Sequence, residues 1–200
     1  SQVASDGNLT ACVAGPALPE PRTGAAAISL SGVPYIVGGL DASGAPTTSV
    51  YVGKVENGVV QSWELSNGQN GTVDLTLPVA VSDAAGASSA GGLYLFGGRT
   101  ADGLFDQTLF AATDASGAVT SWQSIGELPM PEPRAGATAV SVGDFVYVLG
   151  GEGLAGPSST IFRLTTDQGV PARNDQDVLL GWGSAPTSEQ LPQPRAQAAT

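Results

Sequence analysis

The fold is decided by a five-residue stretch that occurs three times: YIVGG at 35–39, YLFGG at 94–98 and YVLGG at 147–151. A Leu-Pro pair precedes each copy and a tryptophan follows it: Leu18, Leu77 and Leu128, then Trp63, Trp122 and Trp182. In the first two copies the tryptophan lies 24 positions after the second glycine. Self-similarity at a period of about 50–60 residues predicts a repeat architecture in which each copy is one structural unit.

Each copy carries the signals of four antiparallel strands. A run of small and β-branched residues, a short Gly-containing turn and the aromatic–aliphatic stretch together are typical of a β-hairpin. A third apolar run follows the glycine pair, and a turn rich in Asp, Asn or Gly separates it from the strand with the tryptophan. The first three strands are expected at 25–30, 34–37 and 49–55, at 84–90, 93–96 and 108–113, and at 137–142, 145–149 and 160–165.

Glycine pairs and recurring aromatic residues indicate how the units pack. Glycine has no Cβ, so neighbouring backbones can approach closely at each pair. Aromatic residues recur in the third and fourth strands: Tyr51, Phe110 and Phe162, with Trp63, Trp122 and Trp182. We expect these side chains to fill the space between units, and the alternative is a platform for sugar binding.

These motifs resemble the kelch repeat family of β-propellers. The family signature is an Arg, a small-residue strand, an aromatic–aliphatic strand ending in Gly-Gly, an aromatic third strand and a Trp. The resemblance covers residues 18–200, and the Gly…Ser-Trp ends are similar to kelch-like repeats of bacterial secreted proteins. The middle copy departs from the pattern, with Val81 or Ser82 where the others have Arg22 and Arg134. The third copy carries an insertion near 171–178.

The resemblance implies an all-β, kelch-type propeller made of four-stranded antiparallel blades. The blades are expected at 18–76, 77–127 and 128–190. Residues 1–17 would be a linker or the end of a preceding blade, with a strand at 7–13. The sequence LPQPRAQAA at 191–199 repeats LPEPRTGAA at 18–26, so 191–200 would begin a further blade. Since closed propellers have about four to eight blades, we expect a segment of a larger ring, and a dimerising half-ring is the alternative.

Composition excludes several classes of protein. The net charge of −11, with a single lysine, provides no basic footprint for nucleic acid. No apolar run approaches the roughly 20 residues that span a bilayer as a helix. Cys12 is the only cysteine, so an intrachain disulfide and a Cys-based zinc site are excluded. The acidic, lysine-poor composition favours an extracellular or cell-surface location, and Asn8 and Asn70 match the glycosylation acceptor pattern.

Catalytic groups are scarce in this sequence. Without histidine there is no Ser-His-Asp triad. Galactose oxidase, a copper enzyme with the kelch architecture, needs histidine ligands for its metal, and this sequence has none. Asp102 with Asp106, or Asp175 with Asp177, could share a proton or flank a glycosidic bond, although loop aspartates are more often solvated turn residues. Calcium around residues 41–44 is conceivable, but the spacing is not that of a calcium loop. We expect no catalytic residue, metal or cofactor.

One end of the sheets gathers the candidate binding residues. In an antiparallel unit, the segment before the first strand and the loop between the second and third strands lie at the same end. This places together 18–22, 40–48, 99–107, 128–134, 152–159 and 191–195. The candidate ligand- or partner-binding residues there are Arg99, Arg22, Arg134, Arg195, Asp41, Asp102, Asp106 and Glu152. Arg22, Arg134 and Arg195 recur at one repeat position, so they could instead brace their own units, whereas Arg99 recurs nowhere.

The expected function is that of an extracellular or cell-surface propeller that acts as a binding or assembly scaffold for a protein or glycan. The partner would bind on the face just described. The alternative is part of a secreted carbohydrate-active kelch-propeller enzyme, resembling epimerases or oxidases, with its catalytic groups outside this segment.

Overall fold

A computed structural model of the chain describes residues 14–184 and 190–197. The predictions for a strand at 7–13, for Asn8 and for Cys12 lie outside these residues, as does the end of the last predicted strand at 198–200. Within the described residues every regular element is a β-strand. The prediction of an all-β fold is therefore confirmed.

Three antiparallel sheets follow one another along the chain, one from each copy of the repeat. Sheet 1 consists of β1 (Ala26–Leu30), β2 (Val33–Val37), β3 (Val50–Glu56) and β4 (Val59–Leu65). Sheet 2 consists of β5 (Ala85–Ser89), β6 (Gly92–Phe96), β9 (Thr108–Thr113) and β10 (Val119–Ser124). Sheet 3 consists of β11 (Thr138–Val142), β12 (Phe145–Leu149), β15 (Ile161–Asp167) and β17 (Trp182–Ser184). In each sheet these four strands pair in chain order, as predicted.

Short additional elements occupy the loops. The hairpin of β7 (Arg99–Thr100) and β8 (Gly103–Leu104) lies between β6 and β9, and that of β13 (Glu152–Gly153) and β14 (Gly156–Pro157) lies between β12 and β15. At the other end of sheet 3, β16 (Val170–Pro171) extends the hairpin with β15. The predicted insertion near 171–178 follows β16, and a bridge between Arg173 and Leu179 closes it.

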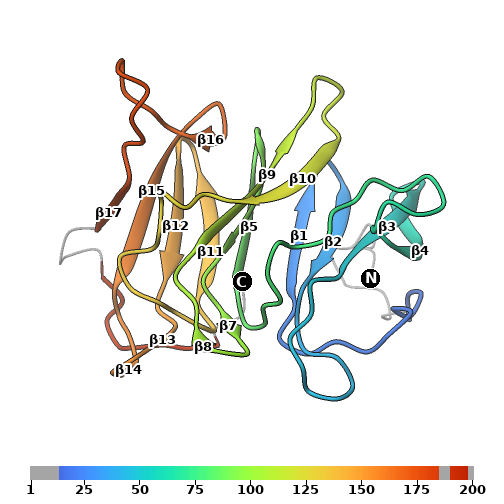
Figure 1. Cartoon of the computed structure of the whole chain (residues 1–200), viewed down its shortest axis with the longest axis horizontal. Helices are drawn as coiled ribbons and strands as arrows, with labels where there is room; N and C mark the ends of the chain where they lie inside the picture. The colour runs from blue at the N-terminus through green and yellow to red at the C-terminus, as the bar shows by residue number, and fades with distance from the viewer. Residues whose placement is uncertain (1–13, 185–189, 198–200) are drawn as a thin grey trace, which may run out of the picture.

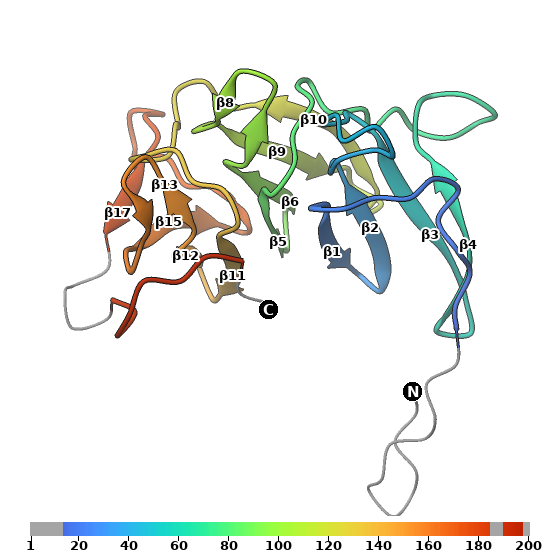
Figure 2. The ribbon, with the colours of Figure 1, turned by 90° about the horizontal axis from the view of Figure 1, so that it is seen from below.

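The three sheets stand side by side in an arc, which is clearest in Figure 2. The first strands β1, β5 and β11 lie on the concave side, and β5 contacts both of the others. Small residues make this approach possible, because a Cβ on Gly86 of β5 would lie only 2.6 Å from the side chain of Ile28 on β1. This packing explains why the first run of each copy is rich in Ala, Gly and Ser.

Two apolar cores lie between the sheets. One joins sheet 1 to sheet 2, and the other joins sheet 2 to sheet 3. All five residues of β6 are buried, whereas β2 buries only Tyr35 and Val37, and β12 buries only Val146 and Val148. Sheet 2 is therefore covered on both faces. We call the face of a sheet that is turned toward the next sheet in the chain its forward face, and the opposite one its backward face.

The strand register corrects one prediction about the aromatic residues. Tyr51 pairs with Ile36 and Phe162 pairs with Val148, but Phe110 pairs with Tyr94, one position away from the equivalent site. A one-residue slip turns a side chain to the other face of a strand. Phe110 therefore lies on the forward face of sheet 2, against the ring of Tyr94 at 4.7 Å. The expected equivalence of Phe110 with Tyr51 and Phe162 was wrong, and Leu109 occupies their place.

The glycine pairs mark the points where successive sheets meet. The second glycine of each pair donates its backbone N–H to a carbonyl in the segment that precedes the first strand of the next repeat: Gly39 to Val81 at 2.9 Å, Gly98 to Arg134 at 2.7 Å and Gly151 to Arg195 at 2.7 Å. A Cβ on the first glycine of each pair would overlap the same carbonyl oxygen, at 2.5 Å for Gly38 and for Gly150. Glycine is required here by close backbone approach as well as by its positive φ.

A second set of backbone hydrogen bonds runs along the concave side. Asp83 donates its N–H to the carbonyl of Gly24 at 2.7 Å, Gly136 to Asp83 at 2.7 Å, and Gln197 to Gly136 at 2.6 Å. These four residues occupy the same repeat position, and all have φ between +53° and +60°. The same backbone contact is thus repeated from each sheet to the next, and it continues to the segment 190–197.

Substitution of Gly38 by Ala should be far more costly than substitution of Gly143. The two glycines have similar φ values, +64° and +56°, but a Cβ on Gly143 meets no atom within 4 Å. Gly143→Ala should cost about 1–2 kcal/mol from its left-handed backbone alone. Gly38→Ala should lose a further 1–3 kcal/mol or so because its methyl group overlaps the Val81 carbonyl. Urea unfolding of both variants measures the difference, and equal losses would contradict the close-approach explanation.

Candidate functional site

The predicted loops do gather at one end of the sheets, which we call the loop face. Bridges join the segment before each first strand to the residue after a glycine pair: Thr23 to Leu40, Ser82 to Arg99, and Ala135 to Glu152. Ser158 is likewise bridged to Arg195. Figure 1 shows the β7–β8 and β13–β14 hairpins at the lower edge of the molecule and β16 at the upper edge.

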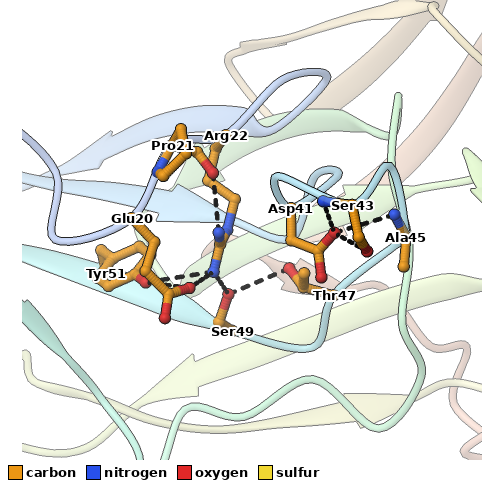
Figure 3. A network of polar contacts seen from close by, with 9 residues as sticks. All are labelled: Glu20, Pro21, Arg22, Asp41, Ser43, Ala45, Thr47, Ser49 and Tyr51. Carbon is orange, nitrogen blue, oxygen red and sulfur yellow. Dashed lines mark hydrogen bonds and ion pairs between the residues drawn. The ribbon is translucent and has the colours of Figure 1, made fainter.

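Arg22 is held inside a local network, shown in Figure 3. Its guanidinium donates hydrogen bonds to the carbonyl of Pro21 at 2.9 Å and to the hydroxyl of Ser49 at 2.9 Å. It also pairs with the Glu20 carboxylate at 2.8 Å and lies over the ring of Tyr51. Only 4% of its side chain is exposed. The network leaves almost no guanidinium surface for a partner.

Arg134 is held in the same way in sheet 3. It donates to the carbonyl of Gly150 at 2.9 Å, pairs with the carboxylate of Glu132, and lies over the ring of Phe162 at 5.2 Å. Its side chain is 2% exposed. For Arg22 and Arg134 the structure favours the bracing role over partner binding, since both join the segment before the first strand to the third strand of the same sheet.

Sheet 2 uses apolar residues for the same connection. Val81 stands at the position of the two arginines, and Leu109 stands at the position of Tyr51 and Phe162. Both are fully buried in the core between sheets 1 and 2. Arginine and its aromatic partner are therefore absent together, which is consistent with a structural role for the pair.

Arg99 and Glu152 form an exposed ion pair between neighbouring sheets. Each residue directly follows a glycine pair, and the guanidinium and carboxylate lie 2.6 Å apart. The side chains are 42% and 48% exposed, so both can be reached from solvent. A cavity of about 260 Å³ beside the pair is also lined by Asp83 and Gln197. The structure thus brings together two of the candidate residues with two that the sequence analysis did not single out.

The other candidates are more dispersed over the loop face. Arg195 is exposed, and its backbone, rather than its side chain, makes the contacts with Gly151 and Ser158. Asp102 donates its N–H to the hydroxyl of Thr100 at 3.2 Å. Asp106 accepts a hydrogen bond from the side chain of Gln107 at 3.0 Å. In the described ranges no three His, Cys, Asp or Glu side chains converge as a metal site would require.

Asp41 stabilises its own turn. Its carboxylate accepts hydrogen bonds from the N–H and hydroxyl of Ser43 at 2.8 and 2.6 Å, and from the N–H of Ala45 at 3.1 Å (Figure 3). Asp114, in the sequence Asp-Ala-Ser-Gly-Ala that the two turns share, makes the same contacts with Ser116 and Ala118. These hydrogen bonds, the Ser hydroxyl first, lower the pKa of both carboxyls. The presence of Asp41 in this loop is therefore explained by its role in stabilising the turn.

Comparisons with known proteins add no assignment. Neither models of protein families nor curated proteins match this chain. Over 14–184 and 190–197, no helix of the length and apolar character needed to cross a membrane is present.

Replacement of Arg134 by Met should destabilise the protein much more than replacement of Arg99. Arg134→Met removes a buried hydrogen bond to the Gly150 carbonyl and an ion pair with the half-exposed Glu132, and we expect a loss of about 2–3 kcal/mol in the free energy of unfolding. Arg99→Met, its matched control, breaks an exposed pair and should cost less than about 1 kcal/mol. Denaturant unfolding tests both, and a larger loss for Arg99→Met would contradict the bracing role.

Removal of one hydroxyl should raise the pKa of each turn aspartate. Ser43→Ala and Ser116→Ala delete the strongest hydrogen bond to Asp41 and Asp114, so both pKa values should move up toward 3.8. In the native protein these lowered pKa values add stability above the pKa of the unfolded chain, and that stability is lost as pH falls through the folded value. Carboxyl NMR titration gives the shifts, and unchanged values in the variants would refute this explanation.

Proposed function

We propose that the chain is part of a kelch-type β-propeller that acts as a binding scaffold outside the cell or at the cell surface. The propeller proposal is supported by the arc of three meander sheets and by the backbone contact that is repeated from each sheet to the next. Repetition of one contact with one sense of rotation is how a radial array of blades is built. The blades would comprise 18–76, 77–127 and 128–190.

The loop face is the binding surface in this proposal. It carries the two hairpins that project between second and third strands, and their sequences differ between repeats while the sheets stay alike. Loops held on a rigid scaffold are where binding residues usually lie. The partner would be a protein or a glycan, bound without metal or cofactor.

The observation that carries this proposal is the Arg99–Glu152 pair beside a polar cavity. Arginine is a frequent anchor at interfaces because its guanidinium offers several donors in a fixed plane. Here it is exposed, it lies between two sheets, and its loop is fixed by the Ser82–Arg99 bridge. A partner carboxylate or hydroxyl could take over the hydrogen bond that Glu152 now accepts from Arg99.

A charge reversal at this position should abolish partner capture. The chain would be immobilised and tested against a glycan array and a panel of purified extracellular proteins. Arg99→Glu should lose capture of the partner at least tenfold, because it repels Glu152 and removes the anchoring donors. Arg173→Glu is the matched control, since Arg173 is 43% exposed and is also paired with an acid, Asp177, but lies on the opposite end of sheet 3. Equal capture by wild type and Arg99→Glu would refute the proposed face.

A further inference from the structure

A cavity of about 320 Å³ lies between sheets 1 and 2, at the end opposite the loop face. Its buried lining includes the apolar Leu75 and Val119 and the polar Ser66, whose hydroxyl donates to the carbonyl of Val73. The turn of the first hairpin, at Ser31, and the turn between β9 and β10, at Gly117, stand on either side of it. Lys54 and Glu64, which form an exposed ion pair at 2.9 Å, also line it.

Tyr35 supplies a polar group to this cavity. The residue is only 7% exposed, and its ring belongs to the core between the two sheets. Tyr35 lines the cavity, and no residue of the described chain hydrogen-bonds to its hydroxyl. Burial raises the pKa of Tyr35, so the hydroxyl remains a proton donor at neutral pH. The hydroxyl is not one of the fully buried polar atoms without a partner in the described residues, so it keeps contact with solvent and can donate to a molecule bound in the cavity.

The equivalent tyrosine of sheet 2, Tyr94, makes a hydrogen bond that Tyr35 does not make. Tyr94 donates its hydroxyl to the carbonyl of Gly169 at 2.9 Å, in the turn that follows the third strand of sheet 3. That turn lies directly against the hairpin turn of sheet 2, where a Cβ on Gly91 would meet the carbonyl carbon of Gly169 at 2.8 Å.

The corresponding turns of sheets 1 and 2 lack this close approach. A Cβ on Gly32 or on Gly117, the residues equivalent to Gly91 and Gly169, would meet no atom within 4 Å. The turn between β9 and β10 therefore lies away from Tyr35. The cavity occupies the space in which a contact equivalent to that of Tyr94 with Gly169 would form.

We propose that this cavity binds a small, neutral, mainly apolar molecule with one oxygen atom that accepts a hydrogen bond from Tyr35. The volume is about twice that of a cavity of about 150 Å³ that holds benzene, so a bicyclic aromatic molecule fits. Lys54 and Glu64 compensate each other at the cavity, and the net charge of −11 disfavours a negative ligand. This site is separate from the loop face, and ligand binding here does not depend on whether that face binds a partner.

Naphthol is a suitable probe, and naphthalene is its control without the hydroxyl. Isothermal titration or saturation-transfer NMR on the intact chain should show binding of naphthol more tightly than of naphthalene. Tyr35→Phe keeps the ring and removes the hydroxyl, so naphthol affinity should fall about threefold to tenfold, the contribution of one neutral hydrogen bond. Tyr147→Phe, the same change at the equivalent tyrosine of sheet 3, should leave binding unchanged.

A second variant tests the position of the site without touching the core. Ala118 lines the cavity from an exposed turn, so Ala118→Trp should fill the opening and abolish binding while the unfolding midpoint stays close to that of wild type. No naphthol binding up to its solubility limit would overturn the proposal. So would undiminished binding by Tyr35→Phe or by Ala118→Trp, or equal affinity for naphthalene and naphthol in the wild type.

Discussion

Backbone contact between consecutive sheets is the constraint on which the rest of the structure depends. At each junction, the N–H of the second glycine in a pair reaches a carbonyl of the next repeat, and a left-handed residue hydrogen-bonds to its counterpart on the neighbouring sheet. The first contact brings backbones closer than a Cβ on the glycine pair allows, whereas the second is also made by residues with side chains, Asp83 and Gln197. The recurrence of Gly-Gly in each copy follows from the first contact, and the small residues of β1, β5 and β11 follow from the close packing of these strands.

The side chains between the sheets adapt to this backbone frame in different ways. Sheets 1 and 3 each bury an arginine over an aromatic ring, whereas sheet 2 buries Val81 with Leu109 at the same positions. The junction of sheets 2 and 3 is closed by Tyr94 and Gly169, but the junction of sheets 1 and 2 leaves a cavity at Tyr35. Repeats with one backbone contact can therefore carry chemically distinct spaces between them.

Much of the fold was predictable because its signals are local. Alternating apolar residues and Gly- or Asp-containing turns gave the strands to within about two residues, the usual uncertainty of such boundaries. The face of the strand on which Phe110 lies was not predictable, because its distance from Gly98 along the sequence is the same in either pairing register of the strand. The gathering of loops followed from antiparallel pairing, but the pairing of Arg99 with Glu152 and the roles of Asp83 and Tyr35 depend on contacts between repeats. No pattern within a single repeat indicates these contacts.

Amide hydrogen exchange tests the central role of the backbone junctions most directly. The N–H groups of Gly39, Gly98 and Gly151, with those of Asp83 and Gly136, should be protected to the same degree as amides in the middle of β6, although all five lie outside the strands. Exchange of these amides at the rate of exposed turn residues, with the strands still protected, would show that the sheets are not joined in this way.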